Sequence, residues 1–276
     1  MTPIISTNDF SNLDNFIVVD CRHNLQDSEQ GRKSYLEGHI PESFFLHADE
    51  DLSNKEKIEK EVYGRHPLPE KKAFVQKLAS IGANNDTLLI AVDDASGVFS
   101  ARFWWLCKWI GHDKCCILDG GIDAWKRSNF ELTTKITHPK KGAIQPRPNL
   151  CAQWTYGEIR AWVNDKSNDK VCLLLDARAK ERFEGLVEPI DKKAGHIPGA
   201  INRPFSENLD ESGLFKPKNV LKKEFLSLLD ERDSSSVVHM CGSGITACHN
   251  LLSMEIAGLT DSALYAGSWS EWCNQS

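Results

Sequence analysis

Residues 237–250 read VVHMCGSGITACHN and combine three local patterns. The apolar run Val237 to Met240 precedes one cysteine, Cys241, and the Gly-Ser-Gly after it opens an apolar-periodic segment that stops before Gly258. A short apolar run bounded by turn residues predicts a buried strand, and a longer periodic segment followed by glycine predicts a helix. The stretch therefore predicts strand, glycine loop and helix in succession, which is the repeating unit of an α/β fold.

The same plan occurs twice in the chain. Three pairs of segments match: FIVVDCR (16–22) with CLLLDAR (172–178), EGHIP (37–41) with AGHIP (194–198), and GGIDAW (120–125) with GSWSEW (267–272). The spacing of the last pair aligns Asp94 with Cys241. Because a duplicated motif set indicates duplicated structure, the sequence predicts two α/β domains, each a mainly parallel sheet flanked by helices on both faces.

The boundary between the two copies is expected where periodicity stops. Residues 135–150 contain three prolines and several basic residues, which is typical of a linker. We expect domains at 1–138 and 139–276. In such sheets, sites gather at the carboxyl ends of strands, and Cys241 stands at such an end.

Composition narrows the function. The net charge of −6 without a basic block argues against a nucleic-acid partner, and the longest apolar runs are too short for a membrane span. The N-terminal residues lack the features of a secretory signal, so we expect a cytoplasmic protein. The nine cysteines, an odd number in no zinc-binding spacing, predict reduced thiols and no metal site. No cofactor motif is evident, and we expect none.

The loop after Cys241 favours thiol chemistry. A free thiol has a pKa near 8.5 and needs help to ionise, which inward-facing N–H groups and a helix N-terminus can supply. Gly242 and Gly244 allow the backbone to approach a bound group closely, and Ser243 offers a hydroxyl for proton transfer. This hypothesis requires amides that point at the sulfur and a thiol that a donor can reach.

The loop has two other interpretations. A cysteine phosphatase would carry the arginine of a C-x5-R signature where this chain has Ala247, so phosphate-ester chemistry is disfavoured. Alternatively, Cys241 is a buried core thiol beside a glycine turn.

The duplicated frame D-x-R, GHIP, loop and G-x-x-x-x-W, from about Phe16 to Trp272, resembles the tandem rhodanese-type sulfurtransferases. That resemblance implies two rhodanese-like domains, an inactive first copy with Asp94 in place of the cysteine, and a catalytic second copy. Cys241 is then the nucleophile that carries sulfur as a persulfide. The implied partners are a small-molecule sulfur donor and a thiol acceptor, such as thioredoxin or glutathione-like thiols, or cyanide.

The loop CGSGIT is similar to the Cys-Gly-Ser-Gly-Val-Thr of family members that use 3-mercaptopyruvate and release pyruvate. The resemblance assigns Gly242, Gly244, Ile245 and Thr246 to substrate binding. Thiosulfate users carry cations in this loop, so a thiosulfate:cyanide sulfurtransferase is the alternative. A sulfur-carrier or redox-sensing module without turnover, and a purely structural tandem protein, also remain open.

Outside the loop, the resemblance assigns the donor's carboxylate to Arg182 in ERFEG. It assigns proton transfer to Ser243 with His66 in RHPLP and Asp49 in FFLHAD.

One position departs from the family pattern. Ile190 stands where mercaptopyruvate users carry a second arginine, with Lys192 and Lys193 as possible substitutes. Lysine lacks the planar fork of arginine, so the donor preference is left open.

Overall fold

The computed structural model describes residues 2–60, 62–165 and 172–275. They form two compact units: the first unit, Met1–Asn54 with Pro69–Leu150, and the second unit, Lys55–Leu68 with Cys151–Ser276. The segment 55–68 thus belongs to the second unit although it lies within the first half of the sequence. No pattern in the sequence predicts this assignment, which bears on the site because His66 lies in the segment.

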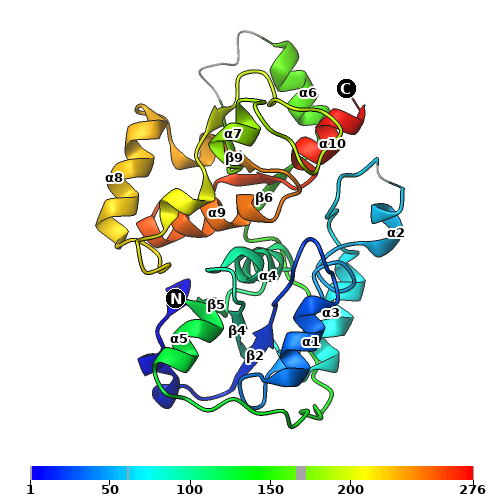
Figure 1. Ribbon diagram of the computed structural model, residues 1–276, viewed down its shortest axis with the longest axis vertical. Helices are drawn as coiled ribbons and strands as arrows, with labels where there is room; N and C mark the ends of the chain where they lie inside the picture. Colours follow the sequence, from blue (N-terminus) through cyan, green and yellow to red (C-terminus); the bar gives the residue numbers. More distant parts are fainter. Residues whose placement is uncertain (1, 61, 166–171, 276) are drawn as a thin grey trace. The chain divides into compact units, whose positions relative to one another are not determined.

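Each unit is built on a five-stranded parallel sheet, and the two sheets have the same strand order (Figure 1). The first sheet has the order β1-β5-β4-β2-β3: β1 (Ile4–Ile5), β2 (Phe16–Asp20), β3 (Phe44–Phe45), β4 (Leu88–Val92) and β5 (Cys115–Leu118). The second has the order β6-β10-β9-β7-β8: β6 (Ala152–Trp154), β7 (Leu173–Asp176), β8 (Ile201–Asn202), β9 (Val237–Met240) and β10 (Ala263–Tyr265). The predicted pair of parallel α/β sheets is confirmed.

Helices connect the strands in both units. In the first unit they are η1 (Thr7–Asn12), α1 (Gln30–Glu37), α3 (Lys71–Ser80), α4 (Val98–Trp109) and α5 (Gly121–Arg127). In the second unit they are α2 (Lys55–Ile58), α6 (Tyr156–Asn164), α7 (Lys180–Phe183), η3 (Phe205–Asn208), α8 (Lys218–Leu229), η4 (Ser234–Ser236), α9 (Thr246–Ala257) and α10 (Ser268–Gln275). Among the residues that the structure describes, no helix has the length and apolar character to span a membrane.

Alternation along the strands places helices on both faces of the second sheet. Leu174 and Val238 pack on one face in a buried cluster with Trp162 of α6 and Trp269 of α10. His239 points to the opposite face, where its Nε2 lies 3.1 Å from the sulfur of a methionine of α9. In Figure 1, α6 and α10 accordingly lie on one side of this sheet, with α8 and α9 on the other. Burial on both faces explains why these strands are short, continuous apolar runs.

In each unit, the arginine of the D-x-R motif connects the sheet to the Gly-His segment of the GHIP motif (Gly38-His39 and Gly195-His196). The Nη2 of Arg22 binds Asp20 Oδ2 at 2.7 Å and donates to the Gly38 carbonyl at 2.8 Å. In the second unit, Arg178 Nη2 binds Asp176 Oδ2 at 2.7 Å and donates to a glycine carbonyl of the second G-H segment at 2.7 Å. Both pairs are buried, where an ion pair requires its remaining donors to be satisfied. The repeated sequence motif is therefore a repeated structural brace.

Helix α9 (Thr246–Ala257) ends where the sequence predicted. The residue after it, Gly258, has φ +78° and ψ 24°. This left-handed conformation suits glycine because it has no Cβ. Helix α9 therefore leads away from the end of β9, and its first turn faces the loop that carries Cys241.

Candidate functional site

The loop between β9 and α9 surrounds the sulfur of Cys241 with backbone N–H groups. The amides of Ser243 and Gly244 donate to Sγ at 3.4 and 3.1 Å. The amide of Cys241 itself donates to Ser268 Oγ at 3.1 Å, and that hydroxyl donates to the carbonyl of Tyr265 at 2.9 Å. Successive amides that converge on one atom form an anion-binding nest. The arrangement therefore favours negative charge on the sulfur.

The two loop glycines are needed for different reasons. Gly244 has φ +77°, and a Cβ there would overlap the carbonyl oxygen of Ala266 and lie 3.0 Å from the Ala266 Cα. A Cβ on Gly242 would lie 2.7 Å from Nη2 of Arg65 and 3.6 Å from both terminal nitrogens of Arg182. Gly244 thus permits the turn, whereas Gly242 leaves room for two guanidinium groups.

The thiol is enclosed. Cys241 is only 2% exposed, and the other loop residues, from Gly242 to Ile245, are buried as well. The sequence hypothesis required both aligned amides and an accessible thiol, and the structure meets only the first requirement. A donor must displace side chains to reach the sulfur. Arg65 and Arg182, which flank Gly242, have partly exposed side chains, at 27% and 17%.

Five of the other cysteines lie in surroundings that disfavour a thiolate. Burial raises the pKa of Cys21, Cys115, Cys116 and Cys273, and raises that of Cys172 to about 12. Such thiols stay protonated at neutral pH and behave as small apolar side chains. They are packing residues rather than nucleophiles.

The first-unit residue that is structurally equivalent to Cys241 lies one position before Asp94, the residue that the sequence spacing predicted. The carbonyl of Cys241 accepts a hydrogen bond from Trp269 N at 2.9 Å, and the carbonyl of Asp93 accepts the matching bond from Ile122 N at 2.9 Å. Asp93 also directly follows the last residue of β4, as Cys241 follows that of β9. Asp93, rather than Asp94, therefore occupies the cysteine position. The sequence spacing failed because the first loop has one residue more before its left-handed glycine.

Asp93 shows what this loop geometry binds. Its carboxylate accepts four backbone N–H groups at 2.8–3.0 Å, two on Oδ1 and two on Oδ2, from Ala95, Gly97, Phe99 and Ser100. The first unit thus fills its nest with a fixed anion. In the second unit, the same backbone geometry surrounds a sulfur.

The proton partners predicted for the site are partly brought together. His66 Nδ1 and Ser243 Oγ are hydrogen-bonded at 2.8 Å, and both side chains are buried. Asp49 belongs to the first unit, where its backbone N–H donates to His47 Nδ1 at 3.1 Å. The Ser243–His66 pair is therefore present within the second unit, and the participation of Asp49 stays a prediction.

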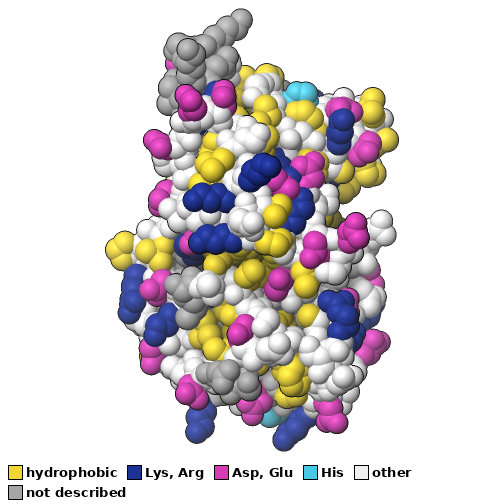
Figure 2. Space-filling model, turned by 90° about the vertical axis from the view of Figure 1, so that its left-hand side faces the viewer, with side chains coloured by type: hydrophobic (Ala, Val, Ile, Leu, Met, Phe, Trp, Pro, Cys, Tyr) yellow, Lys and Arg dark blue, Asp and Glu magenta, His cyan; other side chains and the backbone are white. Residues whose placement is uncertain are grey.

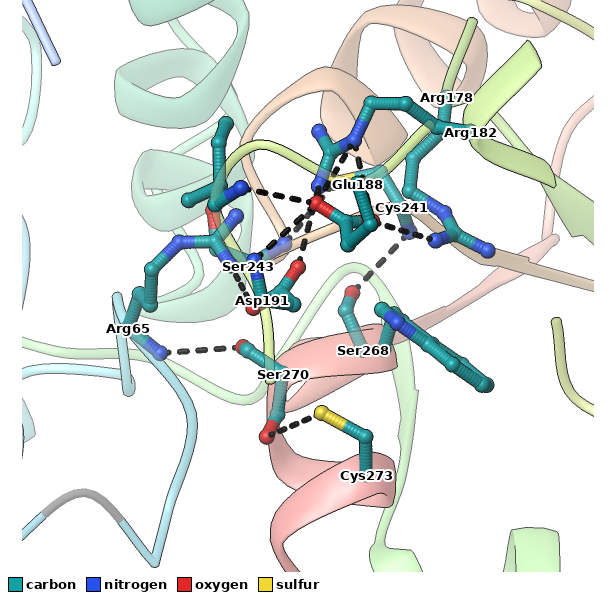
Figure 3. A network of polar contacts seen from close by, with 12 residues as sticks. Arg65, Arg178, Arg182, Glu188, Asp191, Cys241, Ser243, Ser268, Ser270 and Cys273 are labelled. Atoms are coloured by element: carbon teal, nitrogen blue, oxygen red, sulfur yellow. Dashed lines mark hydrogen bonds and ion pairs between the residues drawn. The ribbon is translucent and has the colours of Figure 1, made fainter. Parts of the chain in front are cut away.

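Arg182 lies beside Gly242, within a network of charges, and its assignment to the donor's carboxylate stays a prediction. Its Nε donates to both carboxylate oxygens of Glu188 at 3.2 Å, and its Nη2 donates to Glu188 at 2.7 Å and to Asp191 at 3.0 Å. Arg178 approaches the same Glu188 at 3.4 Å. Figure 3 shows these side chains beside Cys241. Guanidinium groups near the nucleophile can bind a substrate carboxylate in a bidentate manner.

Glu188 is the central acceptor of this network. Burial alone would raise its pKa, but hydrogen bonds from Arg182 and from the amides of Asp191 and Ile190 outweigh burial and lower the pKa below its usual value. Glu188 is therefore ionised at neutral pH and fixes Arg182 in place.

The sequence reasoning missed Arg65. Its guanidinium forms an ion pair with Asp191, and its backbone N–H donates to Ser270 Oγ at 3.1 Å. Lys192 and Lys193, the possible substitutes for the second arginine, have exposed side chains, and their role stays a prediction. The only signal for Arg65 was its position directly before His66, in a segment assigned to the other domain.

Two further features have some of the properties of a binding site: a cluster of potential metal ligands and a surface hollow. Potential ligand atoms of His23, His47 and Asp49 lie within 4.8 Å of one another. However, His47 Nε2 already bonds to the Ser28 carbonyl at 2.9 Å, and His47 Nδ1 accepts the amides of Asp49 and Glu50. Since both ring nitrogens are engaged, we do not assign a metal there.

A hollow of about 740 Å³ lies beside α8 in the second unit. It is lined by Asn202, Arg203, Glu207, Lys216, Asn219, Val220, Lys223, Glu224, Ser227 and Leu228. Figure 2 shows the side that carries α8, with basic and acidic side chains next to one another in its upper part. Arg203 is already paired with Glu207 and Glu224, and the lining contains no nucleophilic thiol among the described residues.

The fold and the loop together define a class: a duplicated parallel α/β protein whose second unit holds one cysteine in an anion-binding nest. A family model of the rhodanese-like domain matches the chain twice, at residues 7–128 and 159–275. The chain belongs to the rhodanese family, with two copies of the domain.

Several relatives of the chain are named as sulfurtransferases. A probable 3-mercaptopyruvate sulfurtransferase of Pseudomonas aeruginosa is 42% identical over 257 residues, which cover 93% of this chain and 88% of that protein. A putative thiosulfate sulfurtransferase, SseB of Mycobacterium tuberculosis, is 33% identical over 259 residues, covering 92% and 87%. The structure of 3-mercaptopyruvate sulfurtransferase from Leishmania major has a TM-score of 0.85 at 26% identity, covering 99% of this chain and 74% of that one. The protein is therefore a sulfurtransferase.

Proposed function

We propose that the protein transfers the sulfur of 3-mercaptopyruvate to a thiol or cyanide through a persulfide on Cys241 and releases pyruvate. The observation that carries the proposal is that the Cys241 sulfur accepts hydrogen bonds from the amides of Ser243 and Gly244. The corresponding loop of the first unit binds the carboxylate of Asp93 in the same way. The relative with 42% identity bears the name of this activity.

In the first half-reaction, the Cys241 thiolate attacks the sulfur of the donor. An S–S bond forms, and the C–S bond of the donor breaks with its electron pair on carbon, which gives the enolate of pyruvate. That carbon takes up a proton through the Ser243–His66 hydrogen bond of 2.8 Å. Asp49, in our proposal, orients His66. The enzyme retains one added sulfur atom.

In the second half-reaction, an acceptor thiolate or cyanide attacks the outer sulfur. The S–S bond breaks, the product is the acceptor persulfide or thiocyanate, and the Cys241 thiolate returns. Thioredoxin and glutathione-like thiols are the acceptors that we favour. All nine cysteines are among the described residues and none forms a disulfide, which supports action in a reducing compartment such as the cytoplasm.

The first unit suggests where the outer sulfur rests. Counting from the left-handed glycine of each loop, the amides of Phe99 and Ser100, which bind Asp93 Oδ2, correspond to those of Thr246 and Ala247. We assign these two amides to the outer sulfur, while Ser243 and Gly244 bind Sγ. Helix N-terminal amides suit an anion there.

A thiosulfate:cyanide sulfurtransferase is the second candidate. Two guanidinium groups, of Arg65 and Arg182, lie at Gly242 and could bind a sulfonate dianion, and one relative is named for this activity. Comparison of kcat/KM for the two donors discriminates the candidates, and we expect 3-mercaptopyruvate to be preferred. Steady-state release of pyruvate over many turnovers would exclude the sulfur-carrier module.

The test is intact-protein mass spectrometry after incubation with 3-mercaptopyruvate. Wild type should gain the mass of one sulfur atom, and cyanide should remove it. Cys241→Ser should gain nothing, whereas Cys172→Ala, which removes a buried thiol of the same unit, should still gain one sulfur. If wild type forms no adduct and releases no pyruvate, the proposal fails.

A further inference from the structure

Arg65 stands out because it lies beside the nucleophilic loop without a role in the mechanism above. Its Nη2 is 2.7 Å from the position that a Cβ of Gly242 would occupy, and both terminal nitrogens of Arg182 are 3.6 Å from the same position. Gly242 directly follows Cys241 in the chain. Two guanidinium groups thus converge on the residue next to the reacting sulfur, and the absence of a side chain at Gly242 makes room for them.

The carboxylate of Asp191 shows that the two guanidinium groups can share one anion. Arg65 Nη1 pairs with Asp191 Oδ1, and Arg182 Nη2 donates to Asp191 Oδ2 at 3.0 Å. In Figure 3, Asp191 lies between Arg65 and the Glu188–Arg182 pair. The carboxylate is nearly buried, with 4% of its side chain exposed. The two guanidinium groups are therefore close enough to bind one carboxylate together, which is the geometry that a donor carboxylate would use in exchange for Asp191.

Arg182 alone has limited capacity for a donor. Its Nε and Nη2 are engaged by Glu188 at 2.7–3.2 Å, so one edge of its guanidinium is already occupied. Arg65 is held less tightly, because its guanidinium pairs through Nη1 while Nη2 is the atom nearest Gly242. Its side chain is also the more exposed of the two, which allows it to move when a donor enters.

We propose that Arg65 is a substrate-binding residue: with Arg182 it forms a two-guanidinium site for the carboxylate of an α-keto acid donor. Asp191 is a positioning residue that holds both groups beside Gly242 when no donor is present. This inference rests on the proposed function for the identity of the donor. In this proposal the segment 55–68 supplies two residues to the site of the second unit, Arg65 and His66.

Steady-state kinetics provide the first test. Arg65→Gln should raise the KM for 3-mercaptopyruvate about tenfold or more and leave kcat within about threefold, because the lost contact binds substrate and transition state alike. Arg65→Lys should give an intermediate KM, since it keeps the charge and loses the fork. Arg32→Gln, which removes an exposed arginine paired with Glu29 and Glu50, should leave both constants unchanged.

Alkylation of Cys241 provides a readout that does not require turnover. Iodoacetate carries a carboxylate, and iodoacetamide is its neutral counterpart of the same size. The ratio of their rates at Cys241 should fall about fivefold in Arg65→Gln relative to wild type and stay constant in Arg32→Gln. Thermal melting checks that each variant is folded.

The outcomes separate the two proposals. If wild type releases no pyruvate, the proposed function fails, and the alkylation ratio alone decides the role of Arg65. If KM and the ratio are unchanged in Arg65→Gln, or if both reagents slow equally, Arg65 does not bind the donor. If neither reagent modifies wild-type Cys241, the site does not admit anions of this size and the inference is overturned.

Discussion

Gly244 and Gly242 offer a matched pair of substitutions in one loop. In Gly244→Ala, the new side chain must adopt φ +77° and would overlap the carbonyl oxygen of Ala266. The left-handed conformation costs about 1 kcal/mol for a residue with a Cβ, and the backbone shift adds about 1–3 kcal/mol. In Gly242→Ala, the Cβ meets only the end of the Arg65 side chain, which can rotate away. Its cost should stay below about 1 kcal/mol.

Thermal and chemical unfolding measure this difference. Gly244→Ala should lower the free energy of unfolding by about 2–4 kcal/mol and the melting temperature by roughly 5–10 °C. Because the Gly244 amide donates to the Cys241 sulfur, the rate of persulfide formation should also fall about tenfold to hundredfold. Gly242→Ala should instead raise the KM for the donor, since it displaces Arg65. Equal stability of the two variants, or an unchanged sulfur-transfer rate in Gly244→Ala, would refute the reasoning.

Three other predictions concern charge and proton transfer. Asp93→Ala should lower the free energy of unfolding by about 2–4 kcal/mol, because four amides lose their acceptor. Asp94 is exposed, so Asp94→Ala should change this free energy by less than about 0.5 kcal/mol; unfolding in urea measures both variants. Glu188→Gln should lower the melting temperature at pH 7. Because folding lowers the pKa of Glu188, the ionised carboxylate stabilises the protein above about pH 4.3, and this stabilisation is lost as the pH falls through the pKa of the folded state. The melting temperatures of wild type and variant should therefore converge in acid. Ser243→Ala and His66→Gln should each reduce kcat for pyruvate release about hundredfold, and the double variant should be no slower than the slower single one, because the two side chains act as a unit.

The sequence predicted the parts of the fold that have strong local signals. The runs around β2, β4, β7 and β9 are apolar and bounded by turns, and Gly258 marks the end of α9. The two-residue strands β1, β3 and β8 were not predicted, because pairing with a neighbouring strand defines them and two residues show no periodicity.

The site was predicted less completely for physical reasons. Sequence spacing predicted Asp94 as the equivalent of Cys241, because Asp93 and Asp94 are both acidic and spacing cannot locate a single extra loop residue. The hydrogen bond from Ile122 N to the Asp93 carbonyl shows that Asp93 is the equivalent residue. Arg65 was missed because its role depends on where the segment 55–68 packs, which is a tertiary property. The enclosure of Cys241 likewise depends on side chains distant in sequence.

The carboxylate of Asp93 has a consequence for the stability of the first unit. A loop built to hold a charged sulfur leaves several buried donors unpaired if the cysteine is simply replaced by an apolar residue, and the fold would be weakened at that point. In the first unit, the carboxylate of Asp93 accepts four such donors, so the loop keeps its shape without a cysteine. We expect the acidic residue to be required for the structure of this loop, whether or not the first unit has any chemistry of its own.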